Sequence, residues 1–422
     1  MRYTLDFFCS DGKDNLKGDL EPSGAVIDDP SKSSFVRGLK KLISGDENLK
    51  DSIYIIRVNS EWKKLFNTFF GYWSKDLPIV NEVNNYISHI DEGKYLGISL
   101  NSRLGFLDQT KLLYSMREKE QNLPAGSLWT EYMRQNGELL KIYTPFGYPT
   151  SVRIRFGVAD RNQRVCRYCG KDINGTSFKN DSHTISKCLG NVNYFTRDEC
   201  DACNSRFGST IEQEFLKCIS VYRSLSSLHS GVKNHKTQTD TFSLGVDDCT
   251  KKINLKVIDE NKLEVLDSET YTTLRLDGGL INYHKVYRAL VKFVIGMLPE
   301  EELKYFEETI KWVNGDKYFR NLPIVKQSIF KEPVQQPYIN MYFRINDSNE
   351  YPYLLAEFNV NHLVFIYAIP GCQRDGFEIK TDIIDDFLKL CKINYKCRNL
   401  YMNQPQPVHM NFDVTLHKKH DV

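Results

Sequence analysis

The sequence lacks any hydrophobic run long enough to cross a membrane. Its 422 residues contain no stretch close to the ~18 apolar residues that a transmembrane helix requires. The longest apolar stretch, around residues 286–298, is interrupted by Arg288 and Lys292. The first residues, MRYTLDFFCSDGKD, contain no apolar core of a secretory signal. We therefore expect a cytoplasmic protein with reduced thiols and no membrane partner.

The chain also lacks an excess of charge of one sign. Lys and Arg total 56 and Asp and Glu total 54, so the formal net charge is +2. This balance excludes an acidic or basic tail protein and gives no overall indication of a polyanionic partner. Internal repeats, low-complexity tracts, a P-loop, a dinucleotide-binding glycine motif and a Ser/His/Asp pattern are absent from the sequence. An aromatic content of 12% excludes a disordered chain.

Cysteine is the first informative residue type. Four of the 11 cysteines form two C-x-x-C pairs, Cys166-Arg-Tyr-Cys169-Gly170 and Cys200-Asp-Ala-Cys203. Such pairs bend the backbone so that four thiolates meet in the tetrahedral arrangement that Zn²⁺ prefers. A zinc ion closed by four thiolates has no open position, so we expect it to be structural. A redox dithiol and unrelated cysteines are the competing interpretations.

The residues around these pairs resemble the HNH, or ββα-metal, endonuclease family in its four-cysteine form. That pattern is C-x-x-C, then [DE]-H-I-x-P-x-x-x-G, then C-x-x-C-N. Here the second element reads Ser182-His183-Thr-Ile-Ser-Lys-Cys-Leu-Gly190, and Asn204 follows the last cysteine. The resemblance covers only this part of the chain. It implies a zinc-stabilised, treble-clef-like ββα module.

The resemblance also implies a chemistry, which is the hydrolysis of phosphodiester bonds in DNA, with RNA not excluded. The family's motif histidine is the general base, and it corresponds to His183. One Mg²⁺ or Mn²⁺ ion binds the acid before that histidine and the residue after the last cysteine, which correspond to Ser182 and Asn204. An amide oxygen such as that of Asn204 is a suitable ligand for these ions.

Ser182 departs from the family pattern because a hydroxyl is a weaker ligand than a carboxylate. A replacement acid is one explanation, and Asp181 and Glu212 are the candidates. If residues 204–218 form one helix, Glu212 lies on the same side as Asn204 but two turns further on. Because that reach is long, the alternatives to a ligand are a residue that supports the ligands and a surface acid. A second explanation is an ion with fewer protein ligands and more water. A third is a catalytically degenerate zinc module that binds nucleic acid or a protein partner.

Basic residues gather near the first cysteine pair. Residues 151–172 contain six basic residues against two acids, Asp160 and Asp172. The six are Arg153, Arg155, Arg161, Arg164, Arg167 and Lys171. A local basic face supplies phosphate contacts even when the whole chain is neutral. We expect Arg164 and Arg167 to contact DNA, together with Lys187 and Arg206.

The sequence predicts an α+β protein of three domains. These are an N-terminal α/β domain of unknown role at 1–150, the HNH nuclease module at 151–235, and a C-terminal helix-plus-sheet domain at 236–422. A polar stretch at 226–240 separates the last two, and residues 281–298 have the spacing of a helix with one apolar side. We expect Arg288 and Lys292 on that helix to face solvent or DNA. The C-terminal domain is expected to serve recognition, sensing or oligomerisation. By analogy the chain resembles a restriction or phage-defence effector, with a homo-oligomer or a defence-system protein as further partners.

Overall fold

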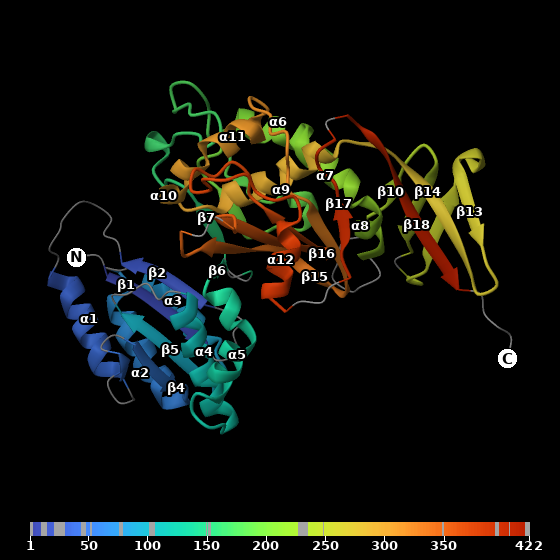
Figure 1. Cartoon of the computed structure of the whole chain (residues 1–422). Helices are drawn as coiled ribbons and strands as arrows, with labels where there is room; N and C mark the ends of the chain where they lie inside the picture. Colours follow the sequence, from blue (N-terminus) through green and yellow to red (C-terminus); the bar gives the residue numbers. More distant parts are fainter. Residues whose placement is uncertain are drawn as a thin grey trace. The chain divides into compact units, whose positions relative to one another are not determined.

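The computed structural model of the chain forms two compact units, Met1–Thr144 and Pro145–Val422 (Figure 1). The described residues are 3–9, 15–20, 30–43, 48–50, 53–75, 79–100, 106–148, 150, 153–226, 235–247, 249–347, 350–392, 396–404 and 406–417. Residues 227–234 of the polar stretch expected to be a linker lie outside them. Helices and strands occur together in both units, so the predicted α+β class is confirmed.

The first unit is a five-stranded antiparallel sheet in the order β2-β1-β5-β4-β3. Neighbouring residues of β4 face opposite sides of the sheet, and both sides are covered. Ile56 packs with Phe35 and Phe66 of α1 and α2, whereas Ile55 packs with Leu112 of α4. The strands are β1 (Tyr3–Cys9), β2 (Asn15–Leu20), β3 (Asn48–Lys50), β4 (Ile53–Arg57) and β5 (Tyr95–Leu100). The helices are α1 (Pro30–Ile43), α2 (Ser60–Trp73), α3 (Ile79–Ser88), α4 (Phe106–Gln121) and α5 (Ser127–Leu140).

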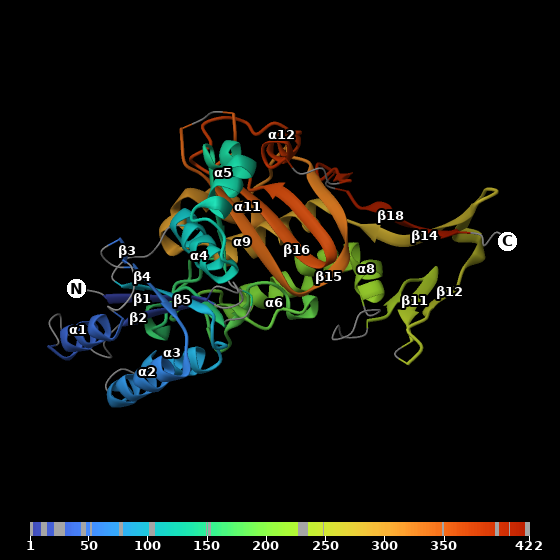
Figure 2. The same ribbon diagram turned by 90° about the horizontal axis from the view of Figure 1, so that it is seen from below.

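The second unit is organised around helix α9 (Tyr283–Met297). Twelve of its residues are buried, which is typical of a helix enclosed on all sides. Phe293 of α9 contacts Phe215 of α7 (Ile211–Cys218) and Phe358 of β16 (Leu354–Ala368). Figure 2 shows β16 beside β15 (Val325–Arg344), and the two strands pair antiparallel along most of their length. The core of this unit therefore joins residues far apart in the sequence.

A small three-stranded sheet, in the order β7-β9-β8, carries the residues of the sequence motif. Its strands are β7 (Ile154–Phe156), β8 (Ser182–His183) and β9 (Tyr194–Thr196). Helix α6 (Asp201–Ser209) follows this sheet directly, so the strands and the helix form the predicted ββα arrangement. The side chain of Thr196 donates a hydrogen bond to the Gly296 carbonyl of α9, 3.3 Å away. The module thus shares its packing with the C-terminal part of the chain.

The remaining elements extend the second unit. Strand β14 lies between β13 and β18, and β11 lies between β10 and β12. Their bounds are β6 (Tyr143–Gly147), α8 (Ser220–Ser226), β10 (Thr237–Gln238), β11 (Phe242–Val246), β12 (Ile253–Val257), β13 (Leu263–Asp267), β14 (Tyr271–Ile281), α10 (Glu300–Leu303), α11 (Glu307–Asn314), α12 (Ile383–Leu390), β17 (Arg398–Leu400) and β18 (Val408–His417). None of the helices in the described ranges combines the length and apolar character that a membrane span needs.

Candidate functional site

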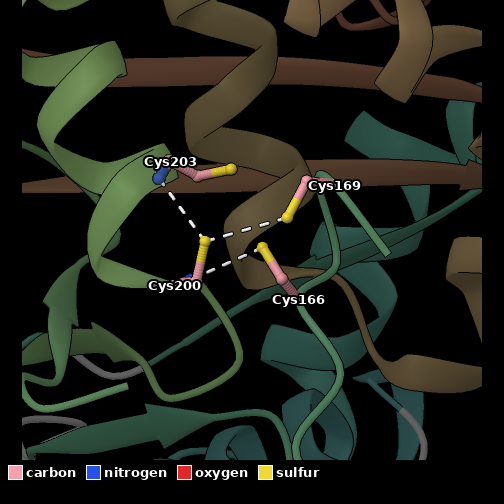
Figure 3. Close-up of side chains that lie close together, drawn as sticks. All are labelled: Cys166, Cys169, Cys200 and Cys203. Atoms are coloured by element: carbon pink, nitrogen blue, oxygen red, sulfur yellow. Dashed lines mark hydrogen bonds between the residues drawn. The ribbon is translucent and has the colours of Figure 1, made fainter. Parts of the chain in front are cut away.

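The first cysteine pair lies in a tight turn. The Gly170 N–H donates to the Cys166 carbonyl at 2.8 Å, and the Cys166 N–H donates to the Lys171 carbonyl at 2.9 Å. Gly170 has a φ of 69°, in the left-handed region that glycine adopts without a steric cost. This turn directs the side chains of Cys166 and Cys169 toward the same point (Figure 3).

The second pair begins helix α6 and completes the cluster. The Cys200 N–H donates to Cys166 Sγ at 3.4 Å, and the Cys203 N–H donates to Cys200 Sγ at 3.5 Å (Figure 3). The four sulfur atoms lie within 4.8 Å of one another, and Cys169 Sγ is 3.8 Å from Cys200 Sγ. A tetrahedral zinc with bonds of about 2.3 Å requires sulfur atoms about 3.8 Å apart. The cluster therefore fits a structural zinc.

The pKa values of the thiols in the cluster shift in different directions. The hydrogen bond with Cys166 raises the pKa of Cys203, and burial raises that of Cys169. A hydrogen bond with Cys203, together with backbone N–H groups, lowers the pKa of the Cys166 thiol to about 5 against the cost of burial. A thiolate is the form that binds a metal. All four cysteines are free of disulfides. Bound by these four side chains, a zinc ion would link the turn at Cys166 to helix α6 and would leave no ligand position open.

Arg206 closes one side of this cluster. Its guanidinium lies 3.8 Å from Cys203 Sγ and donates to the carbonyl and side-chain oxygens of Asn314, at 3.1 and 2.8 Å. The side chain thus connects the cysteine cluster to α11. Arg206 is exposed, and its expected contact with DNA stays a prediction.

His183 lies on β8, opposite Phe195 of β9, and the two ring centroids are 4.6 Å apart. The side chain is half-buried, and its buried Nδ1 has no hydrogen-bond partner among the described residues. Burial lowers the pKa of His183, and the charges of Lys187 and Arg153 lower it further. Its imidazole is therefore neutral at pH 7, as a general base must be.

The two residues before His183 are engaged elsewhere. Ser182 is buried, and its hydroxyl donates to the Glu199 carbonyl at 3.4 Å. The carboxylate of Asp181 pairs with Arg155 at 3.2 Å and with Arg164 at 3.8 Å. The serine hydroxyl and the carboxylate of Asp181 therefore both already have protein partners.

The helix expected at residues 204–218 is interrupted. Helix α6 ends at Ser209 and α7 begins at Ile211, with Thr210 between them in a non-helical conformation (φ −123°, ψ −88°). Glu212 is consequently buried within the protein, and its carboxylate accepts a hydrogen bond from Lys292 at 2.9 Å. Residues 204–218 therefore do not form one helix, so the shared side of Asn204 and Glu212 that such a helix implies does not follow.

Asn204 is the remaining predicted ligand of a catalytic ion. Asn204 is half-buried, and in the described part of the chain no hydrogen bond connects its side chain to Ser182, His183 or Glu212. The only group of three or more His, Cys, Asp or Glu side chains with converging ligand atoms in those ranges is the cysteine cluster. The hydroxyl of Ser182 and the carboxylate of Glu212 have protein partners, and a Mg²⁺ or Mn²⁺ ion shared by Ser182, Asn204 and Glu212 stays a prediction.

Lys292 was expected to face solvent or DNA. It lies inside the unit instead, next to Glu199 and Glu212. Its side chain is fully buried, and Nζ lies 2.9 Å from Glu212 and 3.3 Å from Glu199. Burial alone lowers the pKa of Lys292, but the two carboxylates outweigh that effect and raise it. Burial raises the pKa of Glu199 to about 7. The signal available in the sequence was a lone lysine within an apolar run from Ala289 to Ile295.

The two arginines chosen as the best DNA contacts are internal. Arg167 is buried and forms two hydrogen bonds with Asp198, at 2.7 and 2.9 Å. It also donates to the Ile295 carbonyl of α9 at 2.7 Å. Arg164 is buried and donates to the carbonyls of Val158 and Ala159. Neither guanidinium is available to a phosphate. Among the described residues, Lys187 and Arg153 are exposed cations whose charge acts on His183, and the contact of Lys187 with DNA stays a prediction.

Comparison with known protein families gives a match to the segment that carries the motif. Residues 166–220 match the family described as HNH endonuclease. No curated protein and no solved structure matches the chain. The matched segment begins at Cys166 and ends in α8, so it contains the cysteine cluster, His183, Asn204 and Glu212. The resemblance found in the sequence is confirmed for this segment.

Proposed function

We propose that this chain is an endonuclease that hydrolyses phosphodiester bonds in nucleic acid, with DNA as the expected substrate and His183 as the general base. The proposal depends mainly on the surroundings of His183, within the segment that matches the endonuclease family. Its imidazole has a lowered pKa, a buried Nδ1 without a partner, and two exposed cations close by.

Each of these features has a chemical use. A neutral imidazole accepts a proton from a water molecule, and that water then attacks phosphorus. Lys187 and Arg153 offer positive charge to the phosphate, whose negative charge increases in the transition state. Arg153 lies 4.6 Å from the Phe195 ring, which in turn contacts His183. The structural zinc would hold the turn and helix α6 in place without contacting substrate.

A plasmid-nicking assay tests this role. Zinc-loaded wild-type protein should convert supercoiled DNA to open circles, and His183→Ala should do so at least about 100-fold more slowly because the general base is lost. His409→Ala is the matched control, since its side chain is 64% exposed and lies on β18. Buffers with Mg²⁺ and with Mn²⁺ should both be used. Equal nicking by His183→Ala and wild type would remove His183 from the reaction.

A second function, a non-catalytic zinc module that binds nucleic acid, is favoured by a different observation. Ser182 occupies the position of the family's acid, and the carboxylate of Glu212 pairs with Lys292. Such a module would bind labelled DNA with equal affinity in the wild type and His183→Ala, and neither protein would cleave it. A role in restriction or phage defence, and any activating ligand, stay predictions.

A further inference from the structure

Three oxygen atoms of the matched segment converge on one buried point next to His183. They are a carboxylate oxygen of Glu212 on α7, a carboxylate oxygen of Glu199 and the backbone carbonyl of Thr184. The side chains of Glu199 and Lys292 are completely buried, and Glu212 is 6% exposed. We call these three oxygens, from Thr184, Glu199 and Glu212, the oxygen cage.

The cage has the donor set of a cation site. Carboxylate and carbonyl oxygens are the ligands of hard divalent ions. Here the cation is the ammonium group of Lys292, which donates to Glu212 and to the Thr184 carbonyl. Its contact with Glu199 is an ion pair, since neither carboxylate oxygen of Glu199 has a hydrogen-bond partner among the described residues. Lys292 Nζ lies 2.9 Å from Glu212, 3.3 Å from Glu199 and 3.4 Å from the Thr184 carbonyl.

The cation comes from outside the segment that supplies the cage. Lys292 belongs to α9, whereas the family match ends at residue 220. Helix α9 lies close to β8, since a Cβ added at Gly296 would stand 2.6 Å from Thr184 Cγ2. The Tyr168 hydroxyl donates to the Lys292 carbonyl at 3.1 Å, and this bond fixes the backbone of α9 at Lys292. The ammonium is therefore held in the cage by the packing of the whole unit.

We propose that Lys292 is the resident cation of the oxygen cage, where it takes the place of a divalent ion and fixes strand β8 through Thr184. The identity of the cation follows from geometry alone. Only the consequence for His183, which precedes Thr184 and is the last residue of β8, rests on the proposed function. Lys292 is fully buried, so it acts as a positioning residue and does not touch substrate.

Substitution of Lys292 by Met should convert the cage into a metal site. Met has a similar length and carries no charge, so two carboxylates remain without a cation. Because a ligand that binds the folded state raises its stability, millimolar Mn²⁺ should raise the Tm of Lys292→Met by roughly 5 °C. The Tm of zinc-loaded wild type should not respond to Mn²⁺. The buffer contains no chelator, so that the cysteine cluster keeps its zinc.

The matched control is the triple variant Glu199→Gln, Glu212→Gln, Lys292→Met, which removes the ammonium group and both carboxyl groups. It should fold without Mn²⁺ and show no Mn²⁺-dependent change in Tm. If Lys292→Met responds no more than this control, the proposal is overturned. If Lys292→Met does not fold without an ion, refolding with and without Mn²⁺ gives the same comparison. Recovery only with Mn²⁺ supports the proposal, and no recovery in either case overturns it.

A test on the unaltered cage uses electron paramagnetic resonance of Mn²⁺. Wild type and Glu212→Gln should leave the same fraction of Mn²⁺ free, because Lys292 already fills the cage. Bound Mn²⁺ in the wild type that disappears in Glu212→Gln would contradict the proposal. Neither measurement depends on DNA cleavage. Failure of the cage proposal is therefore distinct from failure of His183→Ala to change the nicking rate.

Discussion

The two cation sites of the second unit are built in different ways. The cysteine cluster takes all its ligands from two short motifs, each of which forms one turn of backbone. The oxygen cage takes its cation from a helix that is distant in sequence, since Lys292 is 80 residues from Glu212. The first site is encoded by local spacing, whereas the second depends on how α9 packs.

The two sites therefore stabilise the fold in different ways. A metal ion that joins the turn at Cys166 to α6 stabilises local structure directly. An ammonium between two buried carboxylates connects three elements, and loss of one partner leaves an uncompensated buried charge. The cluster should therefore respond to chelators, and the cage should respond to charge substitutions on α9.

The largest effect is expected from loss of the zinc. Cys200→Ser removes one thiolate but keeps a side chain that can cap α6. We expect destabilisation on the order of 5 kcal/mol or more, since structural zinc binding is worth roughly 10–16 kcal/mol in small domains. Metal analysis should give one zinc per chain in the wild type and nearly none in Cys200→Ser. Cys249→Ser, at an exposed cysteine, is the control. Unchanged Tm and zinc content in Cys200→Ser would show that the cluster is not a metal site.

The contrast between local spacing and long-range packing also explains which features could be predicted from the sequence. Gly170 and the two C-x-x-C pairs are read directly from local spacing, and the cluster is found where it was predicted. The helix at 281–298 was also predicted, and it is observed as α9. Its burial on every side was not predicted, because apolar periodicity cannot show how many elements surround a helix.

Arg164, Arg167 and Lys292 were expected at the surface but are buried, for a related reason. A count of basic residues cannot distinguish an exposed arginine from one whose guanidinium is satisfied internally. Arg167 finds Asp198 and the Ile295 carbonyl only in the folded chain. Glu212 was placed by assuming one helix through Thr210, where the backbone turns instead. Which charged side chains pair around α9 depends on the tertiary fold, so these pairs cannot be predicted from one sequence.

Arg167 provides the next test, because it connects the cluster's turn to α9. Arg167→Met leaves Asp198 buried without a partner, and such a loss typically costs about 3–5 kcal/mol. Chemical denaturation should detect this change. Lys187→Met should leave the stability unchanged, because Lys187 is exposed. In a DNA-binding assay Lys187→Met should have the larger effect of the two variants. It should reduce the slope of log affinity against log salt concentration by about 1. If Arg167→Met is as stable as the wild type but binds DNA more weakly, Arg167 is a DNA contact and not an internal structural residue.

A smaller effect is expected from His284, in the first turn of α9. Its Nε2 accepts a hydrogen bond from the Trp312 indole at 3.3 Å, and its ring stacks on Tyr318. Burial, and then the charge of Arg288, lower the pKa of His284 to about 4. In the unfolded chain the pKa is about 6.5, so only the unfolded state gains a proton when the pH first falls below that value. Stability should therefore fall between pH 6.5 and about 4, by at most about 3 kcal/mol.

Urea denaturation at several pH values measures this loss, and His284→Gln is the matched variant. The Gln side chain can accept the Trp312 hydrogen bond but does not titrate, so the part of the slope that is due to His284 should disappear. If acid destabilises the α9 side of the unit first, amide hydrogen exchange should increase in α9 and α11 at a higher pH than it does around Cys200. The same pH slope in the wild type and His284→Gln would assign the acid sensitivity to other groups. Simultaneous exchange at α9 and Cys200 would show that the two cation sites unfold as one cooperative unit.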